Sequence, residues 1–252
     1  MIDTPYQLLQ KSDNVTNLTP LPQQGGVGGG SCGGGSCGSS PFCVILADGE
    51  QPEHEVPLRL LQEAPYIVCC DGAIQRCDFA DAVVGDGDSI PSWAREEYDF
   101  MFHQENEQDD NDLTKATRFC IKKGFRRIVY LAATGRREDH TLGNISLLMR
   151  YAREFGIESL MATNYGWFVS VMAAPPTNGL PSVPCSRSFS SFPGQQVSIF
   201  NFGCTVLRTE GLRYDGYPFT SWWQGTLNEA TADHFSIVAD GDYLVYRTYE
   251  SK

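Results

Sequence analysis

Short apolar runs alternate with amphipathic stretches from residue 42 to residue 155. Four runs that end in turn residues predict buried strands at 42–47, 66–70, 82–84 and 127–133. Stretches with apolar residues at helical spacing predict helices at 57–64, 112–123 and 140–155. The pattern also indicates a short helix at 92–98 and a weak strand at 99–103. Alternating strands and helices favour a mostly parallel, Rossmann-like α/β sheet with helices on both faces.

The chain changes character after residue 175. Prolines punctuate it, and apolar segments separated by glycine turns predict strands at 196–200, 205–208, 236–238 and 243–249. No helical pattern recurs there, which favours an all-β sandwich. Near the other end, residues 25–40 are almost entirely glycine and serine, a composition typical of a flexible linker. We therefore expect a disordered Gly/Ser-rich tail at 1–40, an α/β domain at 41–175 and a β-sandwich at 176–252.

Composition narrows the class of protein. The 252 residues, of which 41% are apolar, suffice for a sizeable core. A net charge of −12 disfavours nucleic acid and anionic membranes as partners, because proteins that bind these partners neutralise phosphate groups with lysine and arginine. No apolar run is long enough to span a membrane, and the N-terminus lacks the apolar core of a signal peptide. Scattered cysteines in predicted core positions are typical of reduced thiols, so we expect a cytoplasmic protein.

Acidic residues cluster where predicted elements begin or end. Asp86 and Asp88 follow a predicted strand two residues apart, which places both side chains on one side of an extended backbone. Asp109, Asp110 and Asp112 crowd a predicted helix start without nearby bases, and their repulsion favours a bound cation. Carboxylates without zinc-type spacing suit Mg²⁺, which usually also binds substrate phosphates. The alternatives are an ordinary surface turn and acidic complementation of a helix N-terminus.

A third charged segment, residues 134–140, also lies between a predicted strand and a predicted helix. Backbone amides at a helix start bind anions, and Arg137 adds two parallel donors for a phosphate. Asp139 could complete a metal site or orient substrate, whereas the alternative is a charged loop with His140 as a cap. The residues alone thus predict Mg²⁺-assisted chemistry on a phosphorylated ligand.

Aromatic residues stand among polar turn residues in the β region. Tyr214 and the pair Trp222-Trp223 could stack on a flat heterocycle, even a cationic one. The alternative is that they belong to the core of the sandwich.

Taken together, the motifs resemble those of the thiamin pyrophosphokinase family. That family carries an Asp-Gly-Gly-Ala-like turn, a Gly-Asp-x-Asp-Ser turn, an Asp-x-x-Asp pair opening a helix and a Gly-Gly-Arg-x-Asp-His segment. The corresponding segments here are 71–73, 85–90, 109–115 and 135–144, followed by two similar C-terminal segments at 211–214 and 225–228. The departures are Arg136 for the second glycine, Asn111 for threonine and Leu227 for the serine before Asn228.

The resemblance implies an activity and an architecture. The activity is transfer of pyrophosphate from ATP to the hydroxyl of thiamin, which gives thiamin diphosphate and AMP. The architecture is a catalytic α/β domain for ATP and Mg²⁺, a thiamin-binding β-sandwich and a homodimer with sites at the subunit interface.

The resemblance also implies roles for single residues. The expected catalytic residues that also hold Mg²⁺ are Asp86, Asp88 and Asp112, with Asp109 as a supporting metal ligand. Asp139 is the expected base or water-mediated metal ligand. The residues expected at ATP are Asp71, Gly72, Arg137 and His140. The residues expected at thiamin are Tyr214, Trp222, Trp223 and Asn228.

Two rival functions stay open at the level of sequence. Gly-Asp-x-Asp superficially resembles Mg²⁺-dependent phosphatases with an aspartate nucleophile, here Asp86, although Ile90 stands where those enzymes have threonine. A non-catalytic nucleotide or thiamin sensor would keep the same pocket. Release of AMP, rather than ADP or phosphate, from ATP plus thiamin separates the three.

Overall fold

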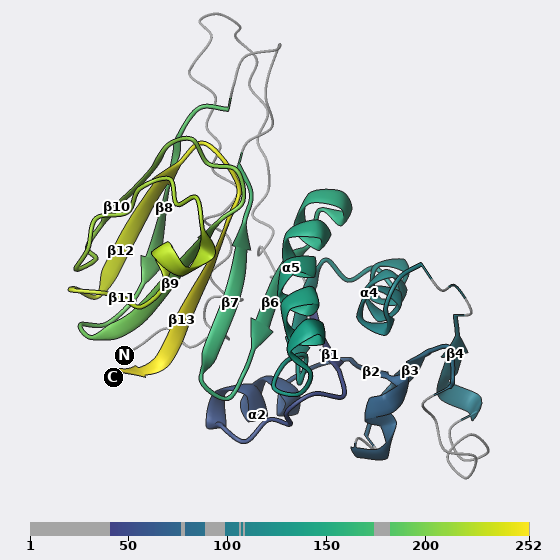
Figure 1. Ribbon diagram of the computed structural model, residues 1–252. Coiled ribbons are helices and arrows are strands. Elements are labelled where there is room, and N and C mark those ends of the chain that lie inside the picture. Colours follow the sequence, from purple (N-terminus) through teal and green to yellow (C-terminus); the bar gives the residue numbers. More distant parts are fainter. Residues whose placement is uncertain are drawn as a thin grey trace, which may run out of the picture.

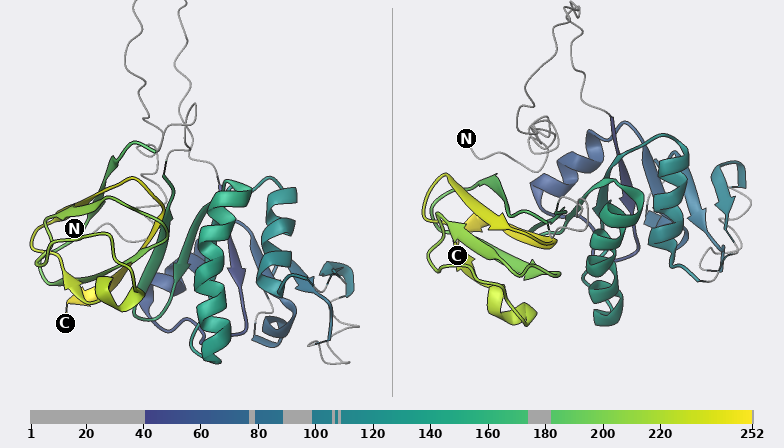
Figure 2. Two further views of the ribbon diagram at one scale, coloured as in Figure 1. Left: turned by 45° about the horizontal axis from the view of Figure 1, so that its top comes forward. Right: turned by 90° about the horizontal axis from the view of Figure 1, so that it is seen from above.

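The computed structural model describes residues 41–76, 79–88, 99–105, 107, 109–173 and 182–251. An α/β region and a β-rich region lie side by side, as Figure 1 and the two directions of Figure 2 show. The expected tail at 1–40 and the expected helix at 92–98 lie outside the described residues.

Parallel strands form the α/β region. Its elements in chain order are β1 (Phe42–Leu46), α2 (Glu55–Gln62), β2 (Ile67–Cys70), a 3₁₀ turn (Asp71–Arg76), β3 (Ala82–Gly85), a second 3₁₀ turn (Asp99–Met101), β4 (Phe102–Gln104), α4 (Asp112–Lys122), β5 (Arg127–Leu131), α5 (Glu138–Phe155) and β6 (Glu158–Ala162). The strands lie parallel in the order β6-β5-β1-β2-β3-β4. The order reverses at β1, and open α/β sheets bind ligands outside the carboxyl ends of the strands at such a point.

Strand β1 explains why the sequence carries continuous apolar runs here. Cys43 and Ile45 pack in one core with α4 and α5, whereas Val44 and Leu46 pack in a second core with α2. Successive side chains of a strand point to opposite faces of the sheet, so a strand with helices on both faces must be apolar throughout.

The β region consists of two sheets. The strands β7 (Gly166–Val171), β9 (Gln195–Asn201), β11 (Asn228–Glu229) and β13 (Tyr243–Ser251) extend the first sheet antiparallel, in the order β11-β9-β13-β7-β6. The second sheet contains β8 (Cys185–Ser190), β10 (Leu207–Glu210) and β12 (His234–Ala239), in the order β10-β12-β8. Ile199, Phe235 and Val245 belong to the core of this region, which is therefore a sandwich with one layer continuous with the α/β sheet.

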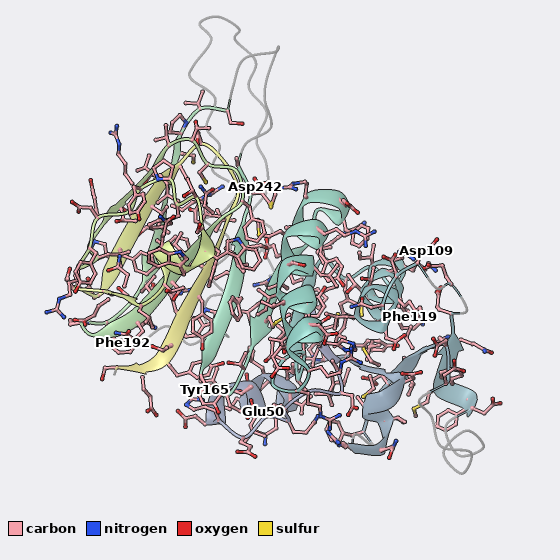
Figure 3. The ribbon with its side chains drawn as sticks, in the orientation of Figure 1. Glu50, Asp109, Phe119, Tyr165, Phe192 and Asp242 are labelled. Atoms are coloured by element: carbon pink, nitrogen blue, oxygen red, sulfur yellow. The ribbon has the colours of Figure 1, made fainter. Side chains whose placement is uncertain are left out.

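Asp242 joins α5 to the β region. Its carboxylate pairs with Arg153 near the end of α5 and accepts the N–H of Ala173 at 2.8 Å, and Figure 3 shows it beside that helix. A helix whose first turns carry the predicted phosphate residues is thus fixed at its other end to the sandwich.

The fold class expected from the sequence is confirmed, with a mostly parallel α/β region followed by a β-rich region. The expected strand at 99–103 is wrong in its first half, which is a 3₁₀ turn before the short β4. The sequence did not predict β6, β7, β8 and β11. The expected boundary at residue 175 lies outside the described residues and stays a prediction, although β7 before it already pairs with β13.

Within the described ranges, no helix is long and apolar enough to cross a membrane. The cysteines there are free thiols, and most of them are buried, as the sequence led us to expect. A cytoplasmic location stays a prediction.

Candidate active site

A cleft of about 350 Å³ lies at the carboxyl ends of β1, β2 and β5. It is lined by the segments that follow these strands and by the starts of α4 and α5; these segments are 47–49, 70–72, 111–113 and 132–134, with Arg136, Arg137, His140, Thr141 and Asn144. This is the position that the reversal of strand order at β1 predicts.

Asp71 ties the turn after β3 to this cleft. Its side chain is 1% exposed, and its carboxylate accepts the N–H of Gly72 at 2.6 Å and of Gly87 at 3.1 Å. Gly85 leaves the space that this carboxylate occupies, because a Cβ on Gly85 would lie 2.6 Å from Asp71 Cγ. The turn that carries Asp86 is therefore positioned by a carboxylate from the neighbouring strand.

Burial raises the pKa of Asp71 to about 6, and the charge of Asp112 raises it as well. The hydrogen bonds from Gly72 and Gly87 act in the opposite direction, and Asp86 adds a smaller upward contribution. Three carboxyl groups thus repel one another on this side of the cleft, an environment that favours a bound cation.

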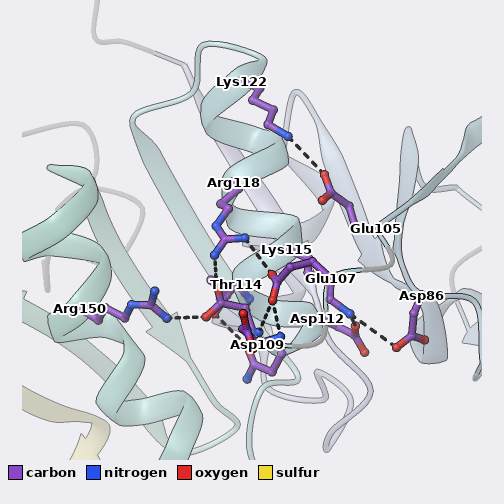
Figure 4. Close-up of polar contacts among 12 residues, drawn as sticks. Asp86, Glu105, Glu107, Asp109, Asp112, Thr114, Lys115, Arg118, Lys122 and Arg150 are labelled. Atoms are coloured by element: carbon purple, nitrogen blue, oxygen red, sulfur yellow. Dashed lines mark hydrogen bonds and ion pairs between the residues drawn. The ribbon is translucent and has the colours of Figure 1, made fainter.

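Lys115 lies between two of the predicted metal ligands. Its Nζ is 3.5 Å from Asp86 Oδ2 and 3.2 Å from Asp112 Oδ1, and its side chain is 2% exposed (Figure 4). Burial lowers the pKa of Lys115, but the hydrogen bonds and charges of Asp112 and Asp86 outweigh burial, so the pKa is raised. The lysine therefore stays charged and holds the two carboxylates beside each other.

Asp86 and Asp112 fit a hard cation that also binds phosphate oxygens. Mg²⁺ usually takes one or two carboxylates, waters and substrate phosphates, and seldom a closed cage of protein ligands. Among the residues that the structure describes, no three Asp, Glu, His or Cys side chains gather closely enough to hold a metal by themselves. A pair of carboxylates beside a cleft matches the small number of ligands that a protein usually supplies to Mg²⁺.

The other acidic residues of the two clusters lie differently. Asp88 is exposed and donates its backbone N–H to Asp86 Oδ1 at 3.1 Å. Asp109 is also exposed, and its backbone N–H donates to Glu107 (Figure 4). Of the four predicted metal ligands, Asp112 is among the described residues that line the cleft, whereas Asp86, Asp88 and Asp109 are not.

The expectation that the acidic cluster before α4 has no nearby base is wrong. Asp110 is bound by Arg118 and by Arg150, the latter at 2.6 Å, and Lys115 binds Asp112. Lys115 and Arg118 come from α4 itself, a few residues after the cluster that they neutralise, whereas Arg150 comes from α5 and is 40 positions from Asp110.

Two asparagines hold the starts of α4 and α5 together. Asn111 is the N-cap of α4, since its Oδ1 accepts the N–H of Thr114 at 3.0 Å. Its Nδ2 donates to Asn144 Oδ1 at 3.1 Å, and Asn144 Nδ2 donates to the carbonyl of Ala133 at 2.8 Å. This chain of bonds fixes both helix starts and the segment after β5 around the cleft.

Each arginine of the predicted phosphate segment pairs with a carboxylate. Arg136 lies 2.6 Å from Asp48 Oδ2, and Arg137 donates two bonds to Asp139 at 3.1 and 2.6 Å. The bonds from Arg137 lower the pKa of Asp139 below its usual range, so this carboxyl is ionised at neutral pH. His140 lines the cleft, and its backbone N–H donates to Asp139 at 2.9 Å.

The predicted thiamin residues lie in the β region, and none of them is among the described residues that line the cleft. The alternative of a sandwich core is wrong for Tyr214 and Trp223, which are 63% and 75% exposed. Trp222 packs edge-on to Phe200 with ring centroids 6.0 Å apart. Asn228 is buried and exchanges two hydrogen bonds with the backbone of Tyr214, at 3.1 and 2.8 Å, so it supports the loop that presents this tyrosine.

The sequence interpretation missed Asp48, Lys115 and Asn144 as members of the site. A signal existed for each of them. Asp48 precedes glycine directly after a strand, as Asp71 does. Lys115 is three residues after Asp112, and Asn144 is four after His140, so each shares a helix face with a residue that was singled out.

Replacing Gly85 by alanine is expected to lower the free energy of unfolding by about 1–3 kcal/mol, because the added methyl group overlaps the buried Asp71 side chain. Chemical denaturation measures the effect. Gly143→Ala is the control, since a Cβ at that helical position meets no heavy atom within 4 Å. This substitution should raise the free energy of unfolding by about 0.5–1 kcal/mol. Equal stability of both variants would contradict the role given to Gly85.

Comparisons with known proteins give matches to one family. The family model for the thiamin pyrophosphokinase catalytic domain matches residues 58–159, and the model for its substrate-binding domain matches residues 182–246. The two matches together span about two thirds of the chain. A comparison with curated protein sequences found no match.

Solved structures show the same fold. The thiamine pyrophosphokinase of Bacillus subtilis is 18% identical with a TM-score of 0.64, and the match covers 82% of this chain and 98% of that one. The thiamin pyrophosphokinase of Candida albicans is 16% identical with a TM-score of 0.65, covering 85% and 95%. The yeast thiamin pyrophosphokinase is 14% identical with a TM-score of 0.65, covering 84% and 87%.

Proposed function

Because the chain belongs to the thiamin pyrophosphokinase family, we propose that it transfers the pyrophosphoryl group of ATP to the hydroxyl of thiamin, giving thiamin diphosphate and AMP. The observation that carries the proposal is the pair Asp86 and Asp112, held by buried Lys115 beside a cleft with two arginines. Phosphoryl transfer depends mostly on positioning and on neutralising phosphate charge, and these groups supply both.

Mg²⁺ is the proposed cofactor. Asp86 and Asp112 would hold it, with Asp88 as a direct or water-mediated ligand and Asp109 in a supporting place before α4. When bound, Mg²⁺ neutralises phosphate charge and polarises the phosphorus under attack. The protein keeps the carboxylates oriented through the contacts of Lys115 and through the hold of Asp71 on the turn after β3.

Arg137, His140, Asp71 and Gly72 are the proposed ATP contacts. All four line the cleft, and Arg137 offers the planar fork that fits phosphate oxygens. Asp139 is the proposed acceptor of the thiamin hydroxyl proton or a water-mediated metal ligand. When the side chain of Arg137 binds a phosphate instead of Asp139, Asp139 loses the hydrogen bonds that lower its pKa. Its carboxylate then becomes a stronger base.

Thiamin is proposed to bind at the exposed aromatic residues of the β region. Tyr214, Trp222 and Trp223 offer faces for a cationic heterocycle, and Asn228 supports the loop of Tyr214. The cleft is lined by described residues of the α/β region and by none of the predicted thiamin residues, which supports a homodimer in which the β region of one chain completes the cleft of the other. Full activity of a protein that is monomeric by light scattering would contradict this arrangement.

A product assay tests the proposed function. Purified protein with ATP, thiamin and MgCl₂ should form AMP and thiamin diphosphate in equal amounts, and chelation of the metal should stop the reaction. Release of ADP or free phosphate instead would favour the phosphatase alternative. Binding of both ligands without any product would favour a sensor.

A further inference from the structure

Asp48 binds two arginines beside the cleft, where the loops that follow β1 and β5 lie next to each other. Its Oδ1 lies 3.2 Å from Arg76 NH1, and its Oδ2 lies 2.6 Å from Arg136 NH1. The side chains of Asp48, Arg76 and Arg136 are 39%, 41% and 44% exposed. Asp48 and Arg136 line the cleft. One carboxylate thus holds two cations, and one of these cations faces the candidate active site.

The backbone beneath this cluster is held in place. Gly49 N–H donates to the carbonyl of Ala132 at 2.6 Å, and Glu50 N–H donates to that of Thr134 at 2.8 Å. Gly135 has a φ of 85°, and a Cβ on it would lie 2.4 Å from Glu50 Cβ. The two loops are therefore fixed against each other, and a change of partner by Arg136 requires only rotation of its long side chain.

We propose that Arg136 is a second phosphate-binding arginine, which Asp48 holds before ATP binds and releases to the triphosphate when ATP binds. The proposal rests on the proposed function and names a further binding residue for it. The matching position of the family motif is glycine, so this arginine is a feature of the present chain.

Arg76 makes the exchange favourable. When Arg136 leaves, Asp48 keeps Arg76 as a partner, so no carboxylate is left without a counter-charge. The pair that breaks is partly exposed, and such pairs contribute little to stability. The bond that forms joins a guanidinium to phosphate oxygens, which is charge-assisted and can be bidentate. Arg136 and Arg137, which are adjacent in the sequence, would then both bind the phosphates of ATP in the cleft.

Two substitutions with opposite expected effects test the exchange. Calorimetry would measure Mg·ATP binding, without thiamin, to the full chain and its variants. Arg136→Gln should raise the Kd for ATP by about tenfold or more, since a charge-assisted bond is lost. Asp48→Asn should lower this Kd about two- to fivefold, since Arg136 no longer has to break an ion pair. Arg59→Gln on α2, which removes an exposed arginine paired with Glu63, is the matched control and should bind ATP like the parent protein.

A purely structural role for the Asp48–Arg136 pair predicts a different result. If the pair only tethers the two loops, both substitutions should weaken ATP binding and lower the Tm together. An Asp48→Asn variant that binds ATP no more tightly than the parent protein, or an Arg136→Gln variant with unchanged Kd, overturns the proposal. A parent protein that binds no ATP would instead reject the proposed function, so the two failures are distinguishable.

Discussion

Asp112→Asn is expected to lower the rate of AMP formation from ATP and thiamin roughly 100- to 1,000-fold, on the scale of other preorganised electrostatic groups. Asparagine keeps the size and shape of the side chain and leaves an oxygen for Lys115, which lies 3.2 Å from Asp112 Oδ1. The substitution removes one formal charge from a residue that lines the cleft and is a proposed Mg²⁺ ligand. The loss should therefore fall on catalysis and on metal dependence more than on folding, since buried Lys115 keeps Asp86 as a charged partner.

Initial rates measured over a range of Mg²⁺ concentrations test this expectation. The variant should need more Mg²⁺ for half-maximal rate. Its Tm should fall slightly, because buried Lys115 loses one of its two carboxylate partners, although Asp71 and Asp86 lose a repelling neighbour. Asp233→Asn is the control, since it removes an 88% exposed carboxylate from the β region and should change neither rate nor metal dependence. A rate for Asp112→Asn within about threefold of the parent protein at saturating Mg²⁺ would remove Asp112 from the site.

The α/β region could be predicted because its signals are local. A run such as 42–46, apolar on both faces, occurs where helices cover both sides of a sheet, and Asn111 caps the helix that its sequence position indicates. Strand β6 could not be found in this way, since Glu158–Ala162 contains no β-branched or aromatic residue and is held by its neighbours β5 and β7. Strand β8 carries serines and an arginine at a sheet edge, which its own sequence does not distinguish from a loop.

The sequence motifs indicated where the site lies, but they did not indicate which basic residues pair with its carboxylates. Acidic residues after strands and at a helix start indicated where the cleft would be, because parallel strands present their carboxyl ends at one edge. Some of the bases that neutralise them are distant in sequence: Arg136 is 88 positions from Asp48, and Arg150 is 40 from Asp110. Only the fold brings such partners together, so a local pattern of acidic residues overstates the charge available for a metal.

Asp71 should make the stability of the metal-free protein depend on pH in the unusual direction for a carboxyl group. Its folded pKa of about 6 lies above the ordinary value of 3.8, so folding favours the protonated form. The resulting stabilisation is fully present below the unfolded pKa and is lost as the pH rises through the folded pKa. A shift of this size corresponds to about 2 kcal/mol between pH 4 and pH 7.

The comparison with Asp71→Asn isolates this effect, because asparagine does not titrate. Asparagine also weakens one of the two bonds from Gly72 and Gly87, but that cost does not vary with pH. Denaturation in chelating buffer should therefore show the parent protein losing about 2 kcal/mol relative to Asp71→Asn as the pH is raised from 4 to 7. Parallel pH profiles for the parent protein and Asp71→Asn would mean that Asp71 is ionised as easily as a carboxyl in water. Burial and the charge of Asp112 would then not keep Asp71 protonated in the absence of a cation.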